Sequence, residues 1–153
     1  MHQLTYTSMA RPDISSKEIS DILAVAQANN QRSEITGCLV FHKGVFVQII
    51  EGVREGVFAM YDKIQTDARH LNVSLVWEGS CLERIFPTWE MAFYNHSSNP
   101  LESASQFEKN LLLLADFSGK PTAAAGLFWL NVKKALTKSI SASDDVGRLM
   151  VTG

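Results

Sequence analysis

Alternation of apolar and polar residues at the start of the chain predicts a first strand. Over residues 2–8, every second side chain of an extended backbone lies on the same side. The two faces then carry different sets: His2, Leu4, Tyr6 and Ser8 on one, and Gln3, Thr5 and Thr7 on the other. A phenol therefore lies on a face that also carries a leucine.

The repeat then changes from that of a strand to that of a helix. Ser15 and Glu18 have the spacing of a capping box, in which each side chain bonds the backbone N–H of the other residue. The apolar positions that follow recur three and four residues apart, at Ile19, Ile22, Leu23 and Ala26. We expect a first helix that starts near Ser16 and buries this stripe.

Further strands and a second helix follow. Residues 38–41 and 45–50 are rich in apolar, β-branched side chains and are joined at Lys43-Gly44, which predicts a hairpin. The next apolar residues have helical spacing, at Val57, Met60, Tyr61 and Ile64. Residues 73–77 predict a fourth strand, and residues 89–93 predict a fifth after the break at Pro87.

The order β-α-β-β-α-β-β predicts an α+β fold, a ferredoxin-like sandwich with a mixed sheet and two helices on one face. Residues 45–50 are apolar on both sides of their strand, so the other face also needs cover. Two amphipathic segments, around residues 107–114 and 127–136, predict C-terminal helices on that face or in a subunit interface. We expect a domain over residues 1–96, a helical extension over 97–140 and a disordered tail over 141–153.

Composition narrows the class of function. The chain has 153 residues, 46% of them apolar, which fits one domain with an appendage. A net charge of -2 without a basic run argues against nucleic-acid or anionic-membrane partners. No signal segment or membrane-length apolar stretch is visible, so we expect a cytoplasmic protein. Cys38 and Cys81 lack metal-ligand spacing and are expected to be buried, reduced thiols.

Polar residues interrupt the apolar pattern at three places. Gln48 lies in the middle of the strand at 45–50, where a buried amide without partners costs about 1 to 3 kcal/mol. Asn29 and Asn30 continue the apolar stripe of the first helix, and Tyr6 lies on the leucine-bearing face of the first strand. If these groups converge, they form a polar notch in an apolar cleft, which suits a flat heteroaromatic ligand. The alternative is structural, because buried Tyr and Gln often complete backbone hydrogen bonds and asparagines often cap helices.

Several stretches, taken in order, resemble the BLUF family of flavin-binding blue-light sensors. The resemblance runs from about Leu4 to Phe93. It rests on Leu4-Thr5-Tyr6-Thr7-Ser8, Asp21-Ile22-Leu23 with Asn29-Asn30, Ile35-Thr36-Gly37-Cys38-Leu39, Val45-Phe46-Val47-Gln48 with Glu51-Gly52, residues 67–70, and Phe86-Pro87 with Trp89 and Met91. Their order and spacing together make the resemblance specific. It implies a ferredoxin-like fold with the flavin ring between the two helices.

The resemblance also implies roles for individual residues. Tyr6 and Gln48 would be the photoactive pair, Asn30 would hold the pyrimidine end of the flavin, and Asn29, where some members carry His, would be a second polar contact. The apolar walls of the ring site would be formed by Ile22, Leu23, Phe46 and Ile64. The ribityl or phosphate end would be contacted by the polar or positive residues Lys63, Arg69 and His70. The signal relay would comprise Ser8, Trp89 and Met91. Simpler alternatives are a helix-end cation for His70 and plain core for Trp89 and Met91.

The implied mechanism is photochemistry without bond-making catalysis, so we do not expect an enzyme. Light would drive electron and proton transfer from Tyr6, and Gln48 would rearrange its hydrogen bonds, which shifts the absorption to the red. FAD is the expected cofactor, with FMN or riboflavin as alternatives. The signal would pass to an unknown downstream protein or within a homo-oligomer. Two other functions stay open: a flavin-dependent reductase, disfavoured by the missing dinucleotide fingerprint, and a colourless interaction module of the same fold.

Overall fold

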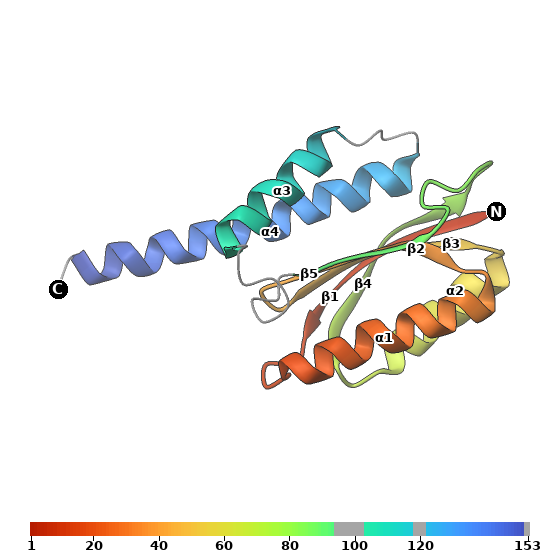
Figure 1. Cartoon of the computed structure of the whole chain (residues 1–153), viewed down its shortest axis with the longest axis horizontal. Helices are drawn as coiled ribbons and strands as arrows, with labels where there is room; N and C mark the ends of the chain where they lie inside the picture. The colour runs from red at the N-terminus through yellow and green to blue at the C-terminus, as the bar shows by residue number, and fades with distance from the viewer. Residues whose placement is uncertain (94–102, 118–121, 152–153) are drawn as a thin grey trace.

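A five-stranded mixed sheet lies between two pairs of helices (Figure 1). The computed structural model describes residues 1–93, 103–117 and 122–151, and the side chains of these residues except 29, 30, 91–93, 116, 117 and 138–151. The strands are β1 (His2–Ala10), β2 (Thr36–His42), β3 (Val45–Gly52), β4 (His70–Ser80) and β5 (Trp89–Phe93). The helices are α1 (Ser16–Ser33), α2 (Arg54–Thr66), α3 (Ala104–Phe117) and α4 (Ala123–Val151). The expected α+β, ferredoxin-like order is confirmed.

The sheet has the strand order β4-β1-β3-β2-β5. β3 runs antiparallel to both β1 and β2, β4 runs antiparallel to β1, and β5 runs parallel to β2. The helices α1 and α2 therefore each join two parallel strands that are separated by one other strand. Right-handed crossovers of this kind place both helices on the same face, as Figure 1 shows.

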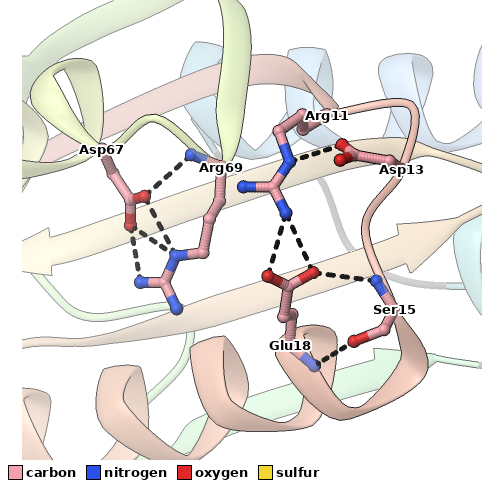
Figure 2. Close-up of polar contacts among 6 residues, drawn as sticks. All are labelled: Arg11, Asp13, Ser15, Glu18, Asp67 and Arg69. Carbon is pink, nitrogen blue, oxygen red and sulfur yellow. Dashed lines mark hydrogen bonds and ion pairs between the residues drawn. The ribbon is translucent and has the colours of Figure 1, made fainter.

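Local sequence signals set the start of α1 and the β2–β3 hairpin. Ser15 Oγ accepts from the backbone N–H of Glu18 at 3.1 Å, and the Glu18 carboxylate accepts from the N–H of Ser15 at 2.9 Å, so the predicted capping box is present (Figure 2). Arg11 adds a guanidinium contact to the same carboxylate at 2.9 Å. In the hairpin, Lys43 and Gly44 both have positive φ, 44° and 82°, as a two-residue turn of this kind requires.

The alternation along β1 and β3 directs side chains into two separate cores. On the α1/α2 face, two clusters pack beneath the helices: Leu4, Tyr6, Ile35, Ile50, Val57 and Tyr61, and Ala10, Ile19, Ile22, Leu23, Leu39 and Phe46. On the other face, Cys38, Val40, Val47 and Ile49 pack with side chains of α3 and α4 that include Phe107, Leu111, Phe128, Trp129, Val132 and Leu136. The C-terminal helices therefore cover the second face of the sheet.

Polar contacts also fix α3 and α4 on the sheet. His42, at the end of β2, bonds through Nε2 to the Glu108 carboxylate of α3 at 2.8 Å. Thr5, on β1, donates from Oγ1 to the carbonyl oxygen of Ala124 in the first turn of α4 at 3.0 Å. Both contacts are buried, so they hold the helices at defined positions.

Three details differ from the expectations. β4 is longer than residues 73–77, and α4 continues through residues 141–151, where small polar residues predict a disordered tail. Once a helix is nucleated, each added residue gains a hydrogen bond, which favours continuation. Cys38 is buried as expected, and burial raises the pKa of its thiol to about 12. Cys81 is only partly buried, because it begins the loop after β4.

Candidate functional site

A cavity of about 220 Å³ lies between α1, α2 and the sheet. Its walls combine apolar side chains with a few polar and charged ones, as small-molecule sites do. The lining residues from the first and third strands and from α1 are Tyr6, Gln48, Ile22, Val25, Ala26 and Ser33. Those from α2 and the segment after it are Gly56, Ala59, Met60, Lys63, Ile64, Asp67, Arg69 and His70.

Tyr6 and Gln48 form a hydrogen-bonded pair in the wall of this cavity. They are direct partners in the antiparallel register of β1 and β3, so their side chains project from the same face of the sheet. The Tyr6 hydroxyl donates to Gln48 Oε1, and both residues are buried. Burial raises the pKa of Tyr6 well above its usual value, with the phenol of Tyr61 and the carboxylate of Asp67 adding to the effect. Tyr6 therefore remains a protonated hydrogen-bond donor across the neutral and mildly basic range.

A charged pair forms one end of the cavity. Asp67 follows the end of α2, and its carboxylate accepts from Arg69 Nη2 at 2.7 Å and from Arg69 Nε at 3.0 and 3.2 Å (Figure 2). The backbone N–H of Arg69 donates to the same carboxylate at 2.9 Å. The guanidinium lowers the pKa of Asp67, and the carboxylate raises the pKa of Arg69. With Lys63 also in the wall, the end near α2 carries two cations and one anion.

His70 is the first residue of β4 rather than a cation at a helix end, because α2 already ends at Thr66. Its Nδ1 lies 2.8 Å from Ser8 Oγ, and its ring packs on that of Phe46 with centroids 4.5 Å apart. Burial lowers the pKa of His70, partly offset by Asp67. The imidazole is therefore neutral near pH 7 and bonds Ser8 from the cavity wall.

Apart from Ser8 and Trp89, the expected site residues divide into three groups. The cavity brings together Tyr6, Gln48, Ile22, Ile64, Lys63, Arg69 and His70. Leu23 and Phe46 do not line it; they are buried in the cluster with Leu39, and Phe46 lies on the same sheet face as Gln48 but packs on the ring of His70. The side chains of Asn29, Asn30 and Met91 lie outside the described residues. The proposed helix-cap alternative does not suit Asn30, since α1 continues to Ser33.

Trp89 packs against the clusters of both α1 and α2 rather than lining the cavity. Its indole Nε1–H is buried and has no hydrogen-bond acceptor among the residues that the structure describes. A buried donor without an acceptor is unfavourable by about 1 to 3 kcal/mol. Trp89 therefore presents a buried donor beside the apolar core of the site.

Several residues that line the cavity were not expected to belong to the site, although Ala26 and Met60 were expected in the apolar stripes of their helices. On α1 they are Val25, Ala26 and Ser33, which continue the spacing of Ile22 by three, four and eleven residues. On α2, Gly56, Ala59 and Met60 repeat the same kind of stripe with Lys63 and Ile64. Small residues on the two stripes leave room between the helices, a signal that apolar periodicity alone does not show. The sequence pointed to Asp67 only as part of residues 67–70, one of the stretches that resemble the BLUF family.

Comparison with known proteins agrees with this geometry. The family model described as "BLUF: Sensors of blue-light using FAD" matches residues 1–92. Photoactivated adenylate cyclase subunit alpha of Euglena gracilis is 39% identical over 83 residues, which cover 54% of this chain and 8% of that protein. The blue light- and temperature-regulated antirepressor BluF of Escherichia coli (strain K12) is 37% identical over 70 residues, 46% of this chain and 17% of the antirepressor. The chain thus spans only a small part of these curated relatives.

Among solved structures, the photo-activated state of BlsA superposes with a TM-score of 0.61 at 26% identity, covering 88% of this chain and 94% of BlsA. The dark state of BlrB, a BLUF protein, gives a TM-score of 0.57 at 27% identity, covering 72% of this chain and 83% of BlrB. The chain belongs to the BLUF family, whose members are sensors of blue light that use FAD.

The cavity residues fit a flavin. Ile22, Ile64 and Met60 offer apolar contact for a flat ring, and the Tyr6–Gln48 pair offers hydrogen-bonding groups at its edge. Lys63, Asp67 and Arg69 lie in the same wall, and because Asp67 pairs with Arg69, this part of the cavity carries one net positive charge that favours a phosphate group. Within the described part of the chain, no cluster of three or more His, Cys, Asp or Glu side chains could hold a metal ion. No described helix is long and apolar enough to cross a membrane.

Proposed function

We propose that this protein senses blue light with a non-covalently bound flavin, FAD in preference to FMN or riboflavin, and is not itself an enzyme. The observation that carries the proposal is the buried Tyr6–Gln48 hydrogen bond in the wall of a cavity that is also lined by Lys63, Asp67 and Arg69. The bound flavin would supply the absorption of blue light and an acceptor for one electron. Tyr6 and Gln48 would supply the part of the response that belongs to the protein.

The Gln48 amide can act as the switch because its two ends are chemically different. In the present arrangement the carbonyl oxygen accepts the Tyr6 hydroxyl hydrogen. When Tyr6 gives up an electron, its hydroxyl becomes strongly acidic and its proton can pass to the amide oxygen. Rotation or tautomerisation of the amide would then exchange which groups donate and accept toward the cavity, and Tyr6 would recover its electron and a proton, so that no net redox change remains. We expect this exchange to change the hydrogen bonds to the ligand and so shift its absorption to the red.

The remaining candidate residues act around this pair. Asn30, with Asn29, is proposed to hold the polar edge of the flavin ring, and Lys63, Arg69 and His70 to contact its ribityl or phosphate end. Trp89, Met91 and Ser8 are proposed as relays that respond to Gln48. The output is proposed to be a contact with a downstream protein or with another copy of the chain in a cytoplasmic homo-oligomer.

A light-minus-dark absorption spectrum of the purified, flavin-loaded protein tests the proposal. A reversible red shift is expected in the parent, and Gln48→Leu should keep the bound flavin and lose the shift. Gln3→Leu is a matched control, because Gln3 is also buried in the same sheet but faces α4. Bleaching by NADH in the dark would instead indicate a reductase, and a protein that binds no flavin would be an interaction module. A normal shift in Gln48→Leu would remove Gln48 from the mechanism.

A further inference from the structure

Phe86 and Trp89 are three residues apart in the chain and pack on opposite faces of the sheet. The Phe86 ring lies against Phe128 and Trp129 of α4, with centroid distances of 6.0 and 6.4 Å. Trp89 packs against the clusters under α1 and α2, on the side of the cavity. The short segment between them therefore joins the core of the proposed light-sensing site to the core beneath α4.

Glu51 fixes the backbone at Phe86. Glu51 is the second-last residue of β3, and its carboxylate is fully buried. One oxygen accepts from the N–H of Ile85 at 2.8 Å and the other from the N–H of Phe86 at 2.9 Å. Gln3 Nε2 adds a longer contact at 3.4 Å. Two charge-assisted bonds to adjacent N–H groups define the position of this backbone more closely than apolar packing would.

Arg84 ties the same loop to the end of α1. Its guanidinium donates to Thr36 Oγ1 at 2.6 Å, to the Glu51 carbonyl oxygen at 3.0 Å and to the Glu34 carbonyl oxygen at 2.8 Å. Glu34 directly follows α1 and has a positive φ of 54°, so this bond holds the backbone where the helix ends. The loop therefore contacts the cavity-lining helix as well as α4.

We infer that residues 84–86, clamped by Glu51 and Arg84, form the contact through which a change at the cavity reaches α4. A shift at the end of α1 would reach this segment through the bond from Arg84 to the Glu34 carbonyl oxygen, and a shift of Trp89 would reach Phe86 through the two residues between them; either would move Phe86 relative to Phe128 and Trp129. Glu51 is a positioning residue here, and Phe86 is the contact. The inference rests on the proposed light-sensing function and goes beyond it by naming where the sensor domain acts on the C-terminal helices.

Hydrogen–deuterium exchange of the full flavin-loaded chain, in darkness and under blue light, tests this connection. In the parent, residues 122–137 are expected to exchange differently in the two conditions. Phe86→Leu keeps an apolar side chain but removes the ring contacts, so it should retain the spectral shift and reduce the light-dark difference in α4 by about threefold or more. Phe107→Leu is the control, since it makes the same change in the same apolar cluster but from α3.

A second variant keeps the test informative if Phe86→Leu does not fold. Glu51→Gln has the same shape but turns an NH₂ group toward a backbone N–H, so it should lose the α4 response and keep the spectral shift. The inference is wrong if either folded variant keeps the parent's full exchange difference, or if Phe107→Leu loses it equally. A parent with a spectral shift but no exchange difference in α4 also overturns it and leaves the proposed function intact. A parent without any spectral shift overturns both.

Discussion

The Tyr6–Gln48 hydrogen bond predicts how the stability of the protein responds to removing either partner. Tyr6 is 1% exposed and Gln48 is 3% exposed, so both side chains are largely removed from bulk water. Tyr6→Phe leaves the Gln48 carbonyl oxygen without its donor, and Gln48→Leu leaves the hydroxyl without its acceptor. Each single change should lower the free energy of unfolding by about 1 to 3 kcal/mol, the usual penalty for an unpaired buried polar group.

The double variant should be less destabilised than the sum of the two single changes. It replaces both partners by apolar groups of similar shape, which leaves no orphaned polar atom from this bond. The coupling energy is therefore expected to be about 1 to 2 kcal/mol, measured by urea unfolding of the four flavin-free proteins at one pH. Tyr6→Phe combined with Gln3→Leu provides an additive control, because Gln3 projects from the opposite face. Additive effects for Tyr6 and Gln48 would refute a stabilising bond between them.

Other residues of the site give three further predictions. Asn30→Ala should weaken flavin binding by about 1 to 3 kcal/mol in a fluorescence titration, and unchanged affinity would exclude Asn30 as a ligand contact. Burial lowers the pKa of His70 from its usual 6.5, so the unfolded chain binds a proton more readily and stability falls as the pH drops below that value. His70→Gln should flatten this loss in urea titrations over the acidic range; an unchanged slope would contradict it. Arg69→Leu should raise the pKa of Asp67, which the guanidinium holds low, as followed by carboxyl carbon NMR; an unshifted titration would show that Arg69 does not set it.

The sequence predicts the faces of the strands well, because alternation has a fixed period of two residues. Alternation places Tyr6 with Leu4 and Gln48 with Phe46 and Ile50, and a shared face toward the helices is a hypothesis that the structure bears out. The direct pairing of Tyr6 with Gln48 could not be predicted, since it depends on the register between β1 and β3. The register aligns Tyr6 with Gln48 and brings the hydroxyl to the amide oxygen.

The helical spacing of apolar residues predicts which side of a helix is buried, but not which of the buried side chains line the cavity. Ile22 lines it and Leu23 does not, although both are apolar and adjacent on α1. A step of one residue turns a helix by about 100°, so one side chain can face α2 across the cavity while the next packs on the sheet. The bonds of Glu51 and Arg84 were also not predictable, because they join a loop without periodicity to distant backbone atoms. Only tertiary folding brings these groups together.

The buried contact between His42 and Glu108 affects how α3 can respond to any stimulus. A helix held by apolar side chains alone can slide over a sheet in small steps, since one methyl group replaces another. A hydrogen bond of 2.8 Å between two specific side chains exists at one position of the helix only. Displacement of α3 would break this bond together with the ion pair that Lys43 Nζ makes with the same carboxylate at 3.5 Å, so two polar contacts would be lost at once. The helix should therefore release from the sheet in a single cooperative step, giving the C-terminal region a threshold rather than a graded motion.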